Sequence, residues 1–346
     1  MRIGSARHSY QHDEALFDSR TQWAWVAVLG AVLCAFPFVT GQYWQFLACL
    51  VGINIIAATG LNVLTGYTGQ VSLGHAAFMG IGAYAVAVLD GWFGQPVLLN
   101  LFGAGLAAML VGLVVGLPSL RIKGLYLALA TIAASFILHF VFAHWTSVTG
   151  GTAGLTVAPA SFFGVVLDTE FRFYWLVMPL MLLMLAGAAN LFRSRTGRAF
   201  IAIRDRDISA EVLGIPLLRY KLLSFGLSSF YAGVAGGLWA YFFRSVTPES
   251  FPLQMSIFFL AAIIVGGMGT ILGGILGAVF MTLVPEVLKI GVGWLPNPGE
   301  AAVMLAPVRT IVFGVLIVGF LILEPHGLAE IWQRIRRFFH LWPFRT

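Results

Sequence analysis

The chain has 346 residues, of which 59% are hydrophobic and 10% are charged. Soluble domains carry about 25% charged residues, so this composition excludes an ordinary water-soluble fold and predicts an integral membrane protein. The formal net charge of +6 does not indicate nucleic-acid binding, because the basic residues stand between apolar blocks, where they set membrane orientation.

Residues 1–21 are polar and lack the basic start and small-residue cleavage site of a secretory signal. We expect them to form a cytoplasmic N-terminal segment that precedes a retained first helix. Apolar blocks nearly or wholly free of interior charge follow, each close to the roughly 20 residues that cross a bilayer core. These blocks are 21–40, 46–64, 97–117, 125–142, 174–192, 222–243 and 309–323.

Two shorter apolar blocks, 76–89 and 256–265, adjoin glycine-rich junctions without charges at 66–75 and 266–270. Neither block spans a bilayer comfortably, so the pattern predicts broken or re-entrant helices. Irregular backbone at membrane depth needs protein or a water-filled cavity around it, and interrupted helices are typical of transport pathways. With these blocks the chain reads as an all-α integral membrane fold of about ten transmembrane helices.

The first junction gathers polar side chains in an apolar neighbourhood, which favours a role in the substrate pathway or in gating. Its candidate residues are Gly66, Gly69, Gln70, Ser72, Gly74 and His75. The alternative is plain helix packing, because small residues let membrane helices approach closely. The similar glycine motifs at 66–74 and 266–274 are short, so an internal repeat and coincidence both stay open.

Basic residues predict the orientation. If the N-terminus, the 117–125 connection, the 193–221 loop and the C-terminal tail all face the cytoplasm, 16 of the 20 Lys and Arg residues lie inside. The chain is then N-in/C-in, with a basic cytoplasmic tail at 326–346 and an outer segment at 144–173. Within the outer segment, Thr149, Gly150, Gly151 and Thr152 are pathway candidates, with helix capping as the alternative.

The 193–221 loop predicts a short helix at 208–213, with Asp207 as its N-cap and Gly214 as a left-handed C-terminal cap. Glu211 lies near the positive helix end, and Ile208 and Val212 share one face. Such a helix favours docking of a soluble partner over an ordinary charged loop. The candidate coupling residues are Arg206, Asp207, Ile208, Glu211, Val212 and Gly214.

Other chemistry finds little support in the sequence. No ionisable residue lies in the middle of a spanning block, which argues against ion coupling, although backbone carbonyls can bind sodium. No Walker phosphate loop occurs, so any ATPase belongs to another chain. His75, His139 and His144 lack metal-ligand spacing with carboxylates. We therefore expect no catalytic residue, no metal and no cofactor on this chain.

The run at 60–78, G-L-N-V-L-T-G-Y-T-G-Q-V-S-L-G-H-A-A-F, resembles the signature of branched-chain amino acid ABC transporter permeases of the LivM type. The segments at 124–131, 149–155, 198–221 and 266–270 agree with that family. The resemblance covers about residues 46–325 and implies a single permease domain at 22–325, working by alternating access in the bacterial plasma (inner) membrane.

The same resemblance implies partners and substrates. It implies two cytoplasmic ATPase subunits that use ATP and Mg, a second related permease subunit, an extracytoplasmic solute-binding protein and membrane lipid. Substrates of such permeases include branched-chain amino acids, urea, short amides and aromatic acids. The rival interpretation is an ATPase-independent secondary carrier or channel for a small polar solute, which needs no partner at the 193–221 loop.

Overall fold

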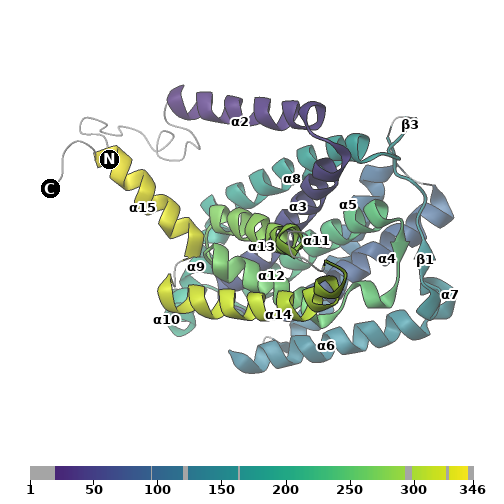
Figure 1. The fold of residues 1–346 in the computed structure, drawn as a ribbon. Coiled ribbons are helices and arrows are strands. Elements are labelled where there is room, and N and C mark those ends of the chain that lie inside the picture. The colour runs from purple at the N-terminus through teal and green to yellow at the C-terminus, as the bar shows by residue number, and fades with distance from the viewer. Residues whose placement is uncertain are drawn as a thin grey trace.

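The computed structural model describes residues 20–94, 96–119, 124–162, 164–292, 298–324 and 327–341. These ranges are mainly helical (Figure 1). The long helices are α2 (Arg20–Val39), α3 (Gln42–Leu61), α4 (His75–Phe93), α5 (Val97–Ser119), α6 (Leu125–His144), α8 (Glu170–Arg193), α11 (Leu217–Phe243), α12 (Leu253–Gly266), α13 (Ile271–Val292) and α14 (Pro298–Leu323).

Seven segments within the described ranges are long and apolar enough to cross a membrane. They are Gln42–Tyr67, Val97–Leu117, Tyr126–His144, Glu170–Arg193, Leu217–Phe243, Pro248–Gly266 and Ile271–Ile290. Two further apolar stretches, Ala24–Val39 in α2 and Ile311–Phe320 in α14, are shorter. The prediction of an all-α integral membrane protein is therefore confirmed.

At the centre of the bundle α11 packs against α3, α4 and α5, and α4 packs against α5. A methyl group at Gly236 of α11 would overlap the carbonyl of Met79, and one at Gly82 would overlap the backbone of Gly233. At Gly233 it would lie 2.5 Å from the carbonyl oxygen of Ala104. Glycine thus permits the close backbone approach that holds membrane helices together without a hydrophobic driving force.

Helix α6 lies at the edge of the bundle and presents large apolar side chains outwards (Figure 1). Tyr126, Phe136, Ile137 and Phe140 are all more than half exposed. Such a surface is unfavourable in water and is satisfied by lipid chains, which agrees with the membrane assignment.

The two ends of the bundle differ in character. One end carries α9 (Arg195–Asp205), α10 (Asp207–Val212) and α15 (Gly327–Leu341), and the other carries α7 (Thr146–Thr149) and the short strands (Figure 1). Strand β1 (Leu155–Thr156) pairs antiparallel with β4 (Ser245–Val246), and β2 (Ser161–Phe162) pairs with β3 (Val165–Val166). Two single-turn helices, η2 (Gly151–Ala153) and η3 (Pro248–Ser250), complete this end.

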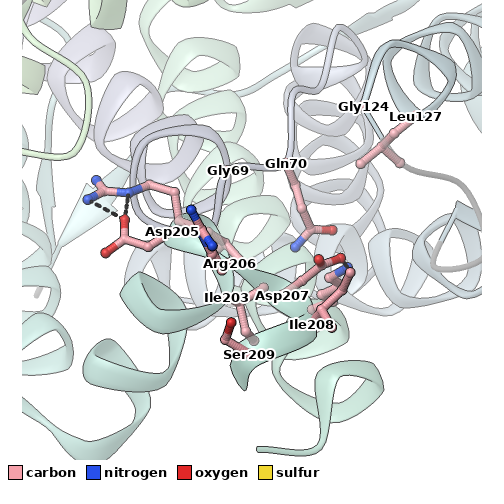
Figure 2. Close-up of a pocket in the computed structure, with 13 residues that line it drawn as sticks. Gly69, Gln70, Gly124, Leu127, Ile203, Asp205, Arg206, Asp207, Ile208 and Ser209 are labelled. Carbon is pink, nitrogen blue, oxygen red and sulfur yellow. Dashed lines mark hydrogen bonds and ion pairs between the residues drawn. The ribbon is translucent and has the colours of Figure 1, made fainter. Parts of the chain in front are cut away.

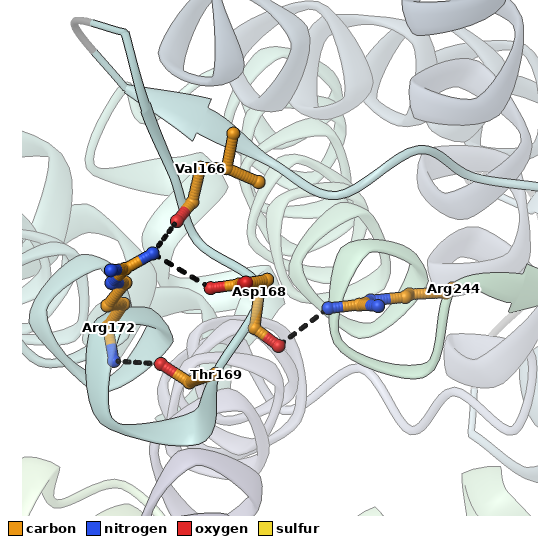
Figure 3. Close-up of polar contacts among 5 residues, drawn as sticks. All are labelled: Val166, Asp168, Thr169, Arg172 and Arg244. Atoms are coloured by element: carbon orange, nitrogen blue, oxygen red, sulfur yellow. Dashed lines mark hydrogen bonds and ion pairs between the residues drawn. The ribbon is translucent and has the colours of Figure 1, made fainter.

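Polar contacts join the strand-bearing end of the bundle to the first turn of α8 and to the residue that follows α11 (Figure 3). Arg172 in the first turn of α8 donates to the carbonyl of Val166 and pairs with Asp168, both at 3.0 Å. Arg244, which follows α11 with a positive φ of 57°, donates to the carbonyl oxygen of Asp168 at 2.7 Å. These contacts hold the segment between α6 and α8 against the N-terminal end of α8 and the C-terminal end of α11.

Two predicted blocks were too short. The block at 76–89 is not a short half-helix, because α4 continues to Phe93 and ends with Gly94 in the left-handed conformation at φ 55°. Asp90 and Asn100 explain the extension, since the Asn100 amide nitrogen lies 3.3 Å from the Asp90 carboxylate and 2.7 Å from the Tyr241 hydroxyl. A polar network between helices thus carries α4 beyond its apolar stretch. Helix α12 itself is short at 14 residues, but with the turn η3 before it the segment Pro248–Gly266 is long and apolar enough to cross a membrane, so the block at 256–265 was also predicted too short.

Candidate coupling and gating site

The first glycine junction is a re-entrant segment. Helix α3 widens into a π-helical turn, η1 (Asn62–Tyr67), and residues 68–74 then run irregularly to the start of α4. The Nε2 nitrogen of His75 lies 2.9 Å from the carbonyl of Ala57, so it carries a proton and donates. Ala57 lies ten residues before Tyr67, about 15 Å back along the helix. Helix α4 therefore begins well inside the bundle.

Side chains from three other helices satisfy the polar groups of this segment. Gln70 donates to the Ser224 hydroxyl at 2.9 Å, and the Thr131 hydroxyl accepts from the Leu73 amide at 3.0 Å. The Ser256 hydroxyl accepts from the Ala76 amide at 2.9 Å. Irregular backbone inside a membrane protein requires such partners. Gln70, Ser72 and His75 are buried and thus contribute to holding the junction in place.

The second glycine turn lies against the first. Asn62 in η1 donates to the carbonyl of Thr270 at 2.8 Å and accepts from the amide of Gly269 at 2.9 Å. A methyl group at Gly66 would overlap the Asn62 side chain and come within 2.5 Å of the Gly269 nitrogen. The two similar sequence motifs therefore meet at one place, held by a single amide side chain that the sequence did not single out.

Arg204, near the end of α9, connects both turns to the polar loop. Its Nη1 donates to the carbonyl of Gly66 at 3.1 Å, and its Cγ would lie 3.1 Å from a methyl group at Gly69. A methyl group at Gly269 would lie 2.6 Å from the same Nη1. Asp205 pairs with the guanidinium at 3.2 Å. The sequence offered no signal that separates Arg204 from the six other basic residues of the loop.

Helix α10 follows directly and closely matches the predicted short helix. It spans Asp207–Val212, and Gly214 has the expected positive φ of 84°. The amides of Gly214 and Ile215 donate to the carbonyls of Glu211 and Ala210, which is the bonding pattern of a Schellman cap. Asp207 is not the N-cap, which is Arg206; instead Asp207 lies in the first turn, where Lys221 approaches its carboxylate at 3.6 Å.

One face of α10 is apolar and exposed. Ile208 is 70% exposed, Val212 83% and Leu213 80%, whereas Ala210 on the opposite side is buried. Leaving three large apolar side chains in water is unfavourable. This face has the composition of a surface that inserts into a partner.

The glycine junction and the polar loop border the same cavity of about 520 Å³ (Figure 2). Thr68, Gly69 and Gln70 line it from the junction, and residues 203–209 line it from α9 and α10. Gly124, Leu127 and Lys221 complete the lining. Two groups of predicted site residues, about 140 positions apart in the sequence, are therefore brought together at one end of the bundle.

The candidates in the outer segment lie at the opposite end. The hydroxyl oxygen of Thr149 lies 2.7 and 2.8 Å from the carbonyl oxygens of Phe142 and Trp145, which share its one hydrogen. Gly150 and Gly151 have positive φ values of 72° and 65° and form the tight turn that leads towards β1, and Thr152 is exposed. The structure does not bring these residues to the cavity, and the contacts of Thr149 are those of a helix end.

Among the residues that the structure describes, no group of three or more His, Cys, Asp or Glu side chains is placed to hold a metal ion. The cavity lining offers arginine, lysine and aspartate side chains together with backbone groups of the junction. The cavity thus lies between the start of α10 and the irregular segment of the junction.

Comparisons with known proteins identify the family. A family model described as branched-chain amino acid transport system / permease component matches residues 44–321. The chain is 32% identical over 292 residues to the high-affinity branched-chain amino acid transport system permease protein LivM of Salmonella typhimurium, covering 78% of this chain and 69% of that protein.

Two more distant relatives are informative. A probable branched-chain amino acid transport permease protein LivH of Methanocaldococcus jannaschii is 26% identical over 309 residues, covering 82% of this chain and 90% of that protein. An autoinducer 2 import system permease protein LsrC of Klebsiella pneumoniae is 34% identical over 122 residues, about a third of each chain. The chain is thus a multi-pass membrane protein that belongs to the family of branched-chain amino acid transport permease components.

Proposed function

We propose that the chain is the transmembrane permease subunit of an ATP-driven importer in the bacterial plasma membrane. The observation that carries the proposal is the exposed apolar face of α10, formed by Ile208, Val212 and Leu213 beside the cavity. A short, firmly capped helix with such a face is suited to rest in a groove of a partner. In this proposal two cytoplasmic ATPase subunits provide that groove, and this chain binds neither ATP nor Mg itself.

The contacts around Arg204 support a route by which movement of the ATPase subunits would reach the glycine turns. Movement of α10 passes to α9, from which a single residue separates it, and from Arg204 to the carbonyl of Gly66. The two glycine turns then shift together, because Asn62 joins them. Packed interfaces respond to such pushes by switching between discrete arrangements, so the junction acts as the gate of an alternating-access cycle.

The substrate class follows from the relatives rather than from the cavity. Relatives named for branched-chain amino acid transport match most of the chain, so we propose leucine, isoleucine and valine as substrates, with small amides and other small amino acids as further candidates. Gln70, Ser72, Thr149 and Thr152 are proposed to contact the solute transiently. A solute-binding protein would deliver the solute on the outer side, where the 144–173 segment lies.

The proposal includes an assembly and a topology. A second, related permease subunit would complete the pathway, which agrees with the similarity to permeases of both the LivM and LivH types. We propose ten spans, with α2, α4 and α14 added to the seven segments above, and both termini in the cytoplasm. The domains are then 1–21, 22–325 and 326–346, with 193–221 as the coupling loop.

Co-purification of the tagged chain from its native membrane in mild detergent tests the proposal. We expect an ATPase subunit to accompany the chain and to be lost in the double variant Ile208→Asp/Val212→Asp, because two charges replace the docking face. The matched control, Ile208→Leu/Val212→Leu, keeps that face apolar and should retain the ATPase. Recovery of the chain alone, or equal ATPase recovery with the aspartate variant, would refute the docking role of α10.

A further inference from the structure

Helix α15, which follows the last long helix, has two chemically different sides. At 100° per residue four of its large apolar residues share one arc and its arginines lie outside that arc. These four apolar residues are Ile331, Trp332, Ile335 and Phe338, and the arginines are Arg334, Arg336 and Arg337. Glu330 is the one acidic residue in the helix, so its net charge is positive.

The start of α15 is fixed to the end of the bundle that carries α10. Gly327, with φ at 70°, lies so close to the second glycine turn that a methyl group on it would come within 2.5 Å of the Gly267 nitrogen. Ala329 is buried, and Leu328 packs against the cluster formed by α12, α13 and α14. The two terminal nitrogens of the Arg334 guanidinium, Nη1 and Nη2, donate to the Glu324 carboxylate just after α14, at 3.0 and 3.3 Å.

The remainder of the helix projects from the bundle (Figure 1). Trp332 is 54% exposed, Ile335 46% and Phe338 53%, although an apolar arc of this kind is buried in most stable helices. A helix with an apolar arc, an aromatic residue and a basic polar side is the pattern that lies in a membrane–water interface. Tryptophan prefers the headgroup level, and arginine pairs with acidic headgroups.

We propose that α15 lies on the inner leaflet and binds acidic phospholipid headgroups through Arg336 and Arg337, with Trp332 and Ile335 among the upper acyl chains. Two observations favour lipid over a protein partner. The helix is anchored at the end of a spanning helix, where the leaflet surface lies, and its positive charge complements acidic lipid. This binding surface is separate from the ATPase-docking face of α10 and does not depend on the transport reaction.

Because α15 begins against Gly267, its position also bears on the second glycine turn. Lipid that holds α15 in the interface would hold Gly267 in its observed position, two residues from the amide of Gly269 that Asn62 binds. The acidic lipid content of the leaflet would thereby bias the junction to which Arg204 is joined.

Fluorescence quenching on the full chain in lipid nanodiscs tests the proposal. Cys34→Ala and Cys49→Ala remove the native thiols, and an environment-sensitive dye is placed at Ile335→Cys or, as the matched control on the polar side, at Gln333→Cys. With phosphatidylglycerol present we expect the dye at 335 to be quenched by a spin-labelled lipid and shielded from aqueous iodide. The dye at 333 should show the reverse.

Removing the charges provides the second arm. Each arginine near an acidic surface contributes about 1 kcal/mol, or about fivefold in the equilibrium, so Arg336→Gln/Arg337→Gln should lower the ratio of lipid-bound to unbound α15 in phosphatidylglycerol by that factor for each charge. In pure phosphatidylcholine the same change should have little effect. Equal iodide access at 333 and 335 would overturn the proposal. Shielding at 335 without lipid quenching would also overturn it, since a protein would then cover the helix.

Discussion

At the scale of single residues, the contact of Arg204 with the carbonyl of Gly66 is the connection on which the mechanism most depends. Arg204→Ala should leave ATPase binding intact, because α10 is unchanged, but should uncouple ATP hydrolysis from uptake. A charge-assisted hydrogen bond at a partly exposed site contributes about 1–2 kcal/mol. Solute moved per ATP, measured in proteoliposomes, should therefore fall about tenfold.

Two further variants sharpen that measurement. Arg204→Lys keeps the charge but lacks the planar fork, so it should restore part of the coupling. Arg198→Ala removes an exposed arginine of the same helix that donates to the carbonyl of Arg193 and should behave like the unaltered chain. Parallel loss in Arg198→Ala and Arg204→Ala would mean that the loop contributes only general charge.

Some residues of the candidate site could be predicted from the sequence, and others could not. Gly214, Ile208 and Val212 were predictable, because a left-handed cap and an apolar stripe are local properties. Asn62 and Arg204 were not, because their importance lies in contacts with residues about 140 to 210 positions away. Nothing local distinguishes an arginine that reaches a backbone carbonyl from one that faces water.

At the scale of elements, the approach of the two glycine turns makes a sharp prediction. In Gly66→Ala the new methyl group would overlap Asn62 and press on the Gly269 backbone, which cannot move aside without shifting α13. Overpacking of this kind costs about 1–3 kcal/mol. We expect a lower Tm in detergent and a loss of transport, measured with the same preparation.

The matched control for that variant is Gly30→Ala in α2, where nothing lies within 4 Å of the added methyl group. It should keep both Tm and transport, since alanine also favours helix. If Gly66→Ala matched this control, the turns would be more loosely packed than the structure indicates.

Helix boundaries could be predicted from the apolar pattern of the sequence wherever lipid or protein surrounds a helix uniformly along its length. The pattern predicted α5, α6, α8 and α11 to within a few residues. It failed for α4, because Asp90 and Asn100 satisfy one another and Tyr241 across the bundle, which hydropathy along one segment does not register. The re-entrant segment at 68–74 was predictable in kind, while its hydrogen-bond partners on α6, α11 and α12 were not.

At the scale of the whole molecule, one end of the bundle gathers the cavity, the docking face of α10, both glycine turns and the start of α15. Composition predicted a membrane protein, and the 60–78 run predicted its family, which the comparisons confirmed. That these features converge on Arg204 and Asn62 was visible only in three dimensions.

The central claim is that a partner ATPase drives transport through its contact with α10 and that the chain does not transport solute by itself. Uptake of radiolabelled leucine into proteoliposomes containing the complete complex, with and without ATP, tests it most directly. Uptake should require ATP, disappear in Ile208→Asp/Val212→Asp and persist in Ile208→Leu/Val212→Leu. Uptake that proceeds without ATP and is indifferent to the aspartate pair would contradict the claim and identify the chain as an ATPase-independent carrier.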